Sequence, residues 1–205
     1  MKNILLALSL GVILVLVAVP AKADTITSWS GYLTSDHCTG GCGTPPFGEV
    51  LLNQVGSDVL FTVTLYDEST FVRTGAGSFM SFLFNGVEVE ESDISGAGLT
   101  ADSGAFGTGA SGAFEFGVYF TGQETGGKGN AGPLVFTVQD ALIEDLIQVN
   151  DRNQIFIADI YSSQTGLTGL VDVSSGGTPT VPEPSTMVLL GLGLLGMAAV
   201  RKYKK

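Results

Sequence analysis

The chain has 205 residues, with 20 Asp and Glu against nine Lys and Arg, which gives a formal net charge of −11. Most of the cations lie in two hydrophobic terminal segments, and only Arg73, Lys128 and Arg152 lie between them. The intervening part is therefore more acidic than the total suggests, and a surface of this charge repels nucleic acid and anionic lipid. Nucleic-acid binding is excluded as a function on this ground.

The first 23 residues have the pattern of a secretory signal peptide. Lys2 supplies the positive charge, an apolar run follows it, and Ala21 and Ala23 form a small-x-small cleavage site. Cleavage there leaves Asp24 as the first residue of the mature chain. We therefore expect Sec-type export machinery as a partner, and the alternative is an uncleaved N-terminal anchor.

Two cysteines stand close together near the predicted mature N-terminus. Cys38 and Cys42 are separated by Thr-Gly-Gly, and in an exported chain such a pair predicts a disulfide. A loop this short contributes only about 2 kcal/mol by loop entropy. The alternative is a metal site that uses His37 with both thiols, but the sequence offers no further Cys pair as a source of a fourth ligand.

Residues 24–173 are predicted to form one exported domain that is mostly β. Apolar and polar residues alternate over residues 59–65 and 114–120, as in strands with one buried face. Further strands are expected at residues 49–55, 78–84, 133–138, 154–161 and 167–173. The apolar run 155–158 lacks alternation and predicts a central strand that is buried on both faces.

The other elements of this part of the chain are one short helix and two loops. Residues 140–147 have a helical spacing of apolar side chains, with Asp140 at the N-terminal end. The Gly-, Ala- and Ser-rich residues 95–112 predict a long flexible loop, and residues 174–181 a Gly/Ser/Thr linker. These elements predict an antiparallel β-sandwich, jelly-roll-like, with one short helix.

An acidic cluster and two aromatic residues are candidate binding groups. Alternation predicts an edge strand through the cluster, in which the charges oppose edge-to-edge aggregation. A weak Ca²⁺ site is the alternative, because carboxylate oxygens suit this ion. Trp29 and Tyr32 fit core or strand-edge packing, with stacking on a sugar ring as the alternative. The acidic cluster consists of Glu88, Glu90, Glu91 and Asp93.

No catalytic constellation emerges from the sequence. A Ser-His-Asp arrangement would have to use His37, which fits an ordinary loop histidine better, and no G-x-S-x-G turn is present. Among the 20 carboxylates nothing singles out a pair for glycoside cleavage. We therefore expect a non-enzymatic protein without a cofactor.

Residues 182–205 combine a proline-braced motif, an apolar run and a basic tail. The prolines fix φ and disfavour helix in the residues before them. The run Met187–Val200 has 14 residues and predicts a short transmembrane helix of roughly 21 Å against a bilayer core of about 30 Å. The basic tail is expected on the cytoplasmic side. The motif residues are Pro182, Glu183 and Pro184, and the tail residues are Arg201, Lys202, Lys204 and Lys205.

This arrangement closely resembles the PEP-CTERM sorting signal of exported bacterial proteins. Softer matches to such proteins are C-x-x-x-C-G-T-x-P-F-G from Cys38, F-V-R-T-G from Phe71 and G-P-L-V-F-T-V from Gly132. The resemblance implies processing near Pro182 by an exosortase, a membrane-embedded transpeptidase, in biofilm-forming bacteria that make exopolysaccharide.

The expected function is therefore that of an exported exosortase substrate. It is held transiently in the inner membrane and then resides at the cell surface or in the extracellular matrix, with exopolysaccharide as a candidate partner. The alternative is a carbohydrate- or Ca²⁺-binding module on the same sandwich.

Overall fold

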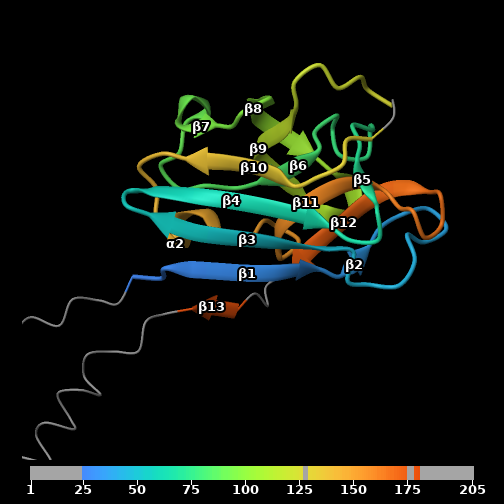
Figure 1. The fold of residues 1–205 in the computed structure, drawn as a ribbon, viewed down its shortest axis with the longest axis horizontal. Coiled ribbons are helices and arrows are strands. Elements are labelled where there is room, and N and C mark those ends of the chain that lie inside the picture. Colours follow the sequence, from blue (N-terminus) through green and yellow to red (C-terminus); the bar gives the residue numbers. More distant parts are fainter. Residues whose placement is uncertain (1–24, 127–128, 175–177, 181–205) are drawn as a thin grey trace, which may run out of the picture.

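The computed structural model describes residues 25–126, 129–174 and 178–180, which fold into two antiparallel sheets (Figure 1). The first sheet has the order β13(Thr178–Thr180), β1(Ser28–Leu33), β3(Gly48–Val55), β4(Asp58–Leu65), β10(Leu134–Val138) and β7(Ile94–Ser95). The second has the order β2(Ser35–Asp36), β12(Thr168–Ser174), β11(Gln154–Tyr161), β6(Phe82–Phe84), β9(Ala113–Phe120) and β8(Leu99–Gly107), with β5(Thr70–Phe71) also beside β11.

The alternating patterns place one face of each strand in the core, as predicted. In β4 the side chains of Val59, Phe61 and Val63 are fully buried, while Leu60 and Thr62 point outward and are only half-buried. An extended backbone turns successive side chains to opposite faces, so the pattern fixes which face is covered. The prediction of a mostly antiparallel β protein with one short helix is confirmed.

Phenylalanine rings join the two sheets into one core. Phe61 of β4 stacks on Phe136 of its own sheet, with ring centroids 4.5 Å apart. From the second sheet it meets Phe84 at 5.3 Å and Phe156 at 5.7 Å. Contacts at this spacing require the inner faces of the sheets to pack against each other, as in a sandwich. The jelly-roll-like connectivity stays a prediction.

A second, smaller cluster of buried hydrophobic residues covers the other face of the second sheet. Met80, Leu83, Phe114, Ile157 and Leu170 form it, and all five are buried. The central strand β11 therefore has one core on each side. This confirms the prediction of a two-side-buried strand from an apolar run without alternation.

The prediction of a flexible loop at residues 95–112 is wrong for most of this segment. It contains the nine-residue strand β8 and a 3₁₀ turn at Gly109–Ser111. Leu99 lies opposite Phe120, and the register shifts between Ser103 and Phe106. Small residues have a low strand propensity, but pairing with the strongly patterned β9 outweighs this preference. The register shift falls in the glycine-containing part of β8.

The predicted helix and the strand at 78–84 are shorter than expected. Helix α2 covers only Ile143–Leu146, because Asp140 has a positive φ of 47° and Leu142 is extended. The Asp145 carboxylate accepts the Leu142 N–H at 3.0 Å and so sets the start of the helix. In the strand, Ser78 and Phe79 have φ values of 50° and 66°, and regular pairing begins at β6.

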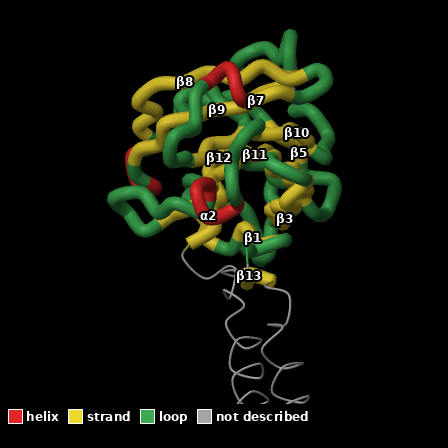
Figure 2. The backbone as a smooth tube through the Cα atoms, turned by 90° about the vertical axis from the view of Figure 1, so that its left-hand side faces the viewer, coloured by secondary structure: helices red, strands yellow, loops and turns green. Residues whose placement is uncertain are grey.

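The two ends of the described chain meet at one edge of the first sheet. β13 pairs antiparallel with β1, which places Ser28 opposite Thr180 and Ser30 opposite Thr178. Figures 1 and 2 show β13 below β1 at the end of the domain. The predicted linker at residues 174–181 thus contains the last residue of β12 and the paired strand β13. Strand β1 was not predicted from the sequence.

Candidate functional site

The loop after β2 carries the two cysteines, which form the predicted disulfide with a Cα–Cα distance of 5.4 Å. The carboxylate of Asp36 closes the same loop, because its Oδ1 accepts the Cys38 N–H at 2.9 Å and its Oδ2 the Cys42 N–H at 2.7 Å. On β12, Gly169 leaves room for this loop, since a Cβ there would lie 2.7 Å from the Cys38 sulfur. The disulfide therefore closes a short loop that packs against the second sheet.

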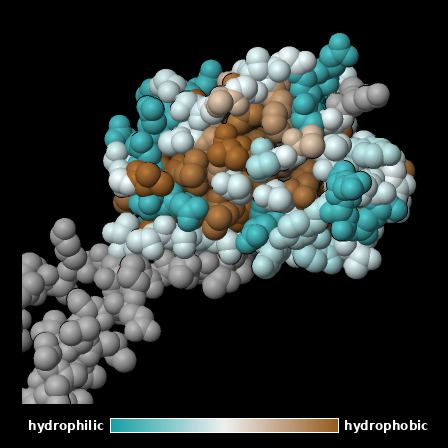
Figure 3. Space-filling view, viewed as in Figure 1, coloured by the Kyte–Doolittle hydropathy of each residue, from teal (hydrophilic) through white to brown (hydrophobic). Residues whose placement is uncertain are grey.

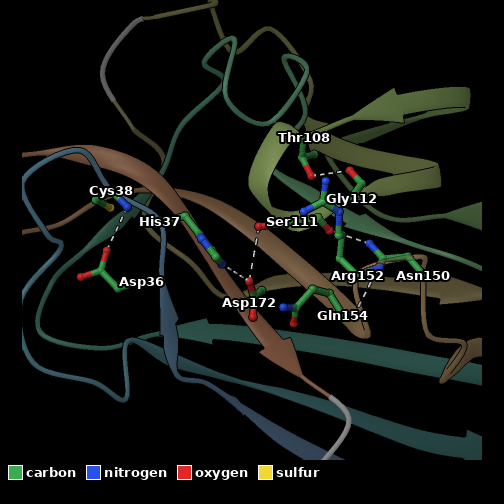
Figure 4. Close-up of polar contacts among 10 residues, drawn as sticks. All are labelled: Asp36, His37, Cys38, Thr108, Ser111, Gly112, Asn150, Arg152, Gln154 and Asp172. Carbon is green, nitrogen blue, oxygen red and sulfur yellow. Dashed lines mark hydrogen bonds and ion pairs between the residues drawn. The ribbon is translucent and has the colours of Figure 1, made fainter.

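The alternative of a metal site at these cysteines does not fit the geometry. Ligand atoms of Asp36, Cys38 and Cys42 lie within 4.8 Å of one another. However, both sulfurs are bonded to each other, and both oxygens of Asp36 already accept backbone N–H groups. Metals bind the free thiolate. Figure 4 shows His37 extending away from this group toward Asp172.

The main polar pair between the loop and the sheet joins His37 to a buried carboxylate. His37 Nε2 lies 2.6 Å from Asp172 Oδ2, and the Asp172 side chain is fully buried on β12. The Ser111 hydroxyl donates to the same oxygen at 3.4 Å, while Asp172 Oδ1 has no partner among the described residues. A carboxylate removed from water needs such partners. His37 therefore partners a buried carboxylate, whereas the sequence suggested an ordinary loop histidine.

Asp172 was missed by the sequence reasoning. Its signal was a carboxylate inside the otherwise apolar run Leu170–Val173, all of whose residues are buried. Such a group requires a cation or donor nearby, and His37 is the one histidine of the chain. Sequence alone did not show that these two residues, 135 positions apart, meet.

The geometry of this cluster does not match an activated nucleophile. The Ser111 hydroxyl donates to the Asp172 carboxylate, whereas nucleophilic serine needs the imidazole as its base. Ser111 is also fully buried. Asn150 adds structural links, because its Nδ2 donates to the Ser111 carbonyl at 2.6 Å and its Oδ1 accepts the Gln154 N–H at 3.0 Å (Figure 4). The cluster therefore ties two loops to the sheet.

A second buried carboxylate, Asp159 of β11, holds the turn that begins at Thr74. Its Oδ2 accepts the backbone N–H and the hydroxyl of Thr74, both at 2.6 Å, and its Oδ1 is buried without a partner among the described residues. Burial raises the pKa of Asp159 to about 6, although the Thr74 hydrogen bonds oppose this shift.

The neighbouring Arg73 closes the same turn. Its Nε donates to the Phe79 carbonyl at 2.7 Å, and its guanidinium carbon lies 3.6 Å from the centroid of the Tyr119 ring. The segment F-V-R-T-G therefore has a structural role in this fold.

The acidic cluster does not form the predicted edge strand. Glu91–Asp93 is a 3₁₀ turn, and Glu88 has a φ of 57°. The carboxylate of Asp93 accepts the Glu90 N–H at 2.8 Å, and that of Glu91 accepts from the Ser103 backbone and hydroxyl at 3.0 and 2.8 Å. Local hydrogen bonds override the alternation. Within residues 25–126, 129–174 and 178–180 these carboxylates do not converge as metal ligands.

The two candidate sugar-stacking residues have different environments. Trp29 is 2% exposed and packs edge-on against Phe156 with centroids 5.3 Å apart, so it belongs to the core. Tyr32 is 53% exposed. Another exposed aromatic, Tyr161, borders a cavity of about 570 Å³ together with Thr70 and Thr168. This cavity was not predicted, because its residues come from separate strands.

Two further hollows lie on the surface. One of about 590 Å³ is bordered by the polar side chains of Asn85, Glu115 and Gln148. The other, of about 290 Å³, lies beside Leu60 and Val135 on the outer face of the first sheet. Figure 3 shows hydrophobic residues gathered over the middle of this face.

The predicted processing sites lie outside the described residues. They are Ala21, Ala23, Asp24, Pro182, Glu183, Pro184, the apolar run 187–200 and the tail residues Arg201, Lys202, Lys204 and Lys205. In the part of the chain that the structure describes, no helix has the length and apolar character to cross a membrane.

Comparison with known families identifies the C-terminal segment. Residues 180–202 match the PEP-CTERM protein-sorting motif. The chain therefore carries this sorting signal, as its sequence predicted, and the signal implies export and membrane-associated processing by an exosortase. No curated protein and no solved structure matches the chain.

Proposed function

We propose that the protein is an exported, non-enzymatic domain that an exosortase releases from a transient C-terminal membrane tether. The observation that carries this proposal is the sorting motif at residues 180–202, which begins at the last residue of β13. The Sec-type signal at residues 1–23 and the basic C-terminal tail both favour placing the domain outside the inner membrane.

The final location proposed is the cell surface or the exopolysaccharide matrix of a biofilm. The acidic domain suits a hydrated matrix, because its like charges keep the protein soluble and dispersed. Support for a non-enzymatic role comes from the polar clusters, since Ser111 and His37 both contact the Asp172 carboxylate instead of each other.

The test replaces the motif by alanine in the variant Pro182→Ala/Glu183→Ala/Pro184→Ala. We expect a membrane-bound precursor in place of the processed form, because the enzyme loses its recognition element. Intact mass spectrometry of membrane and secreted fractions measures this. The control Glu124→Ala removes an exposed carboxylate of the domain and leaves the motif intact. A triple variant with the wild-type mature mass would refute the proposal.

Saccharide binding is a second candidate function, favoured by the cavity beside Tyr161. An exposed aromatic ring with hydroxyl groups at its side suits a sugar ring, and Thr70 and Thr168 supply the hydroxyls. Calorimetric titration with the matrix polysaccharide tests it. Heat that disappears in Tyr161→Ala would support this function, and no heat at millimolar saccharide would reject it. The Ca²⁺ alternative finds no matching arrangement among the described carboxylates.

A further inference from the structure

The strand that precedes the sorting motif is paired with the first strand of the domain. Three residue pairs form the contact, from Ser28 opposite Thr180 to Ser30 opposite Thr178. On its other side β1 pairs with β3 over its whole length of six residues. β13 is therefore an edge strand that covers part of the outer edge of β1.

Very little chain separates this contact from the motif. Thr180 is the last residue of β13, and Pro182 follows after Val181 alone. The family match itself begins at residue 180, so it overlaps the paired strand. The backbone on the N-terminal side of the motif is thus held against the folded domain.

Enzymes that cut or transfer peptide bonds must surround the substrate backbone on both sides of the reacting bond. Neighbouring strands lie only about 4.8 Å apart, which leaves no room for an enzyme cleft between β13 and β1. A substrate segment that is still part of a sheet has one backbone edge already occupied. Processing near Pro182 then requires the residues just before it to be free.

We infer that β13 must separate from β1 before the sorting motif is processed, so that this strand pairing controls the release step. The inference rests on the proposed function. Strand β13 suits such a role, because it has only three residues and lies at the edge of the sheet, where its proline is tolerated. The pairing is therefore weak enough to open, and after release it can close again over the edge of β1.

A disulfide that locks the strands tests this inference. Directly opposed residues of an antiparallel pair have Cα atoms about 4.5–5.5 Å apart, which suits a disulfide. The variant Ser28→Cys/Thr180→Cys joins β1 to β13. The matched control Leu51→Cys/Thr62→Cys joins two opposed residues of β3 and β4 in the same sheet, away from β13.

The full-length variants are produced in cells that contain the exosortase, and peptide mapping by mass spectrometry confirms each cross-link. We expect the conversion of the locked precursor to slow at least tenfold and to recover after mild reduction. The control and the wild type should be processed alike under both conditions. Wild-type conversion of the locked chain would overturn the inference. So would failure of the two thiols introduced at positions 28 and 180 to bond with each other under conditions that oxidise the control. A wild-type chain that is never processed would instead reject the proposed function.

Discussion

Removing the charge of the buried carboxylate at Asp159 should change how stability depends on pH. Its Oδ2 is held by Thr74, and its Oδ1 has no partner among the described residues. Burial raises its pKa from the ordinary value of 3.8 to about 6. The variant Asp159→Asn keeps an oxygen that can accept the hydrogen bonds of Thr74, but its side chain cannot ionise.

The sign and size of the effect follow from the two pKa values. Between pH 4 and pH 6 the folded protein binds the Asp159 proton more tightly than the unfolded chain does, so the free energy of unfolding falls as pH rises. A difference of about two pKa units corresponds to about 3 kcal/mol. Above pH 6 both states are ionised and the contribution is constant. Below pH 4 both states are protonated.

Urea unfolding of the purified protein from pH 3 to pH 7 measures this dependence. We expect the wild type to lose about 3 kcal/mol more than Asp159→Asn across the range. The new amide N–H₂ lowers stability at every pH if it lacks a partner, but this leaves the slope unchanged. Glu124→Gln, at an exposed position, serves as the control. Parallel curves for the wild type and Asp159→Asn would refute the reasoning.

Two further predictions concern the core and the disulfide. Phe61→Ala should lower the free energy of unfolding by about 3–5 kcal/mol, because the ring lies between both sheets. A loss below about 1 kcal/mol in urea unfolding would contradict this. Cys38→Ser/Cys42→Ser should cost only about 2 kcal/mol, because the loop is short. A loss of the β-type circular dichroism spectrum would show that the disulfide does more than close the loop.

The main strands were predictable because each carries its own pattern. Alternation in β4 and β9 fixed their buried faces, and the continuous apolar run in β11 indicated a strand between two cores. The disulfide was predictable because Cys38 and Cys42 are neighbours in sequence. In these cases local residues determine the structure.

The rest depended on partners distant in sequence. β8 has a weak strand sequence and is ordered by β9, while β13 is ordered by β1. The pair of His37 with Asp172 follows from the neighbouring positions of β2 and β12 in the second sheet. The edge strand predicted for the acidic cluster is wrong for the opposite reason, because here a local contact prevails. The Asp93 carboxylate accepts the Glu90 N–H, and the chain turns instead of extending.

The pairing of Ser28 with Thr180 also has a consequence for the proposed membrane tether. The described chain begins and ends at the same edge of the first sheet. In the proposed function, a domain that is attached to the membrane through either terminal segment would therefore be held at this edge, with its opposite loops facing away. Removal of the predicted signal peptide would then leave the point of attachment unchanged, and processing near Pro182 would release the domain.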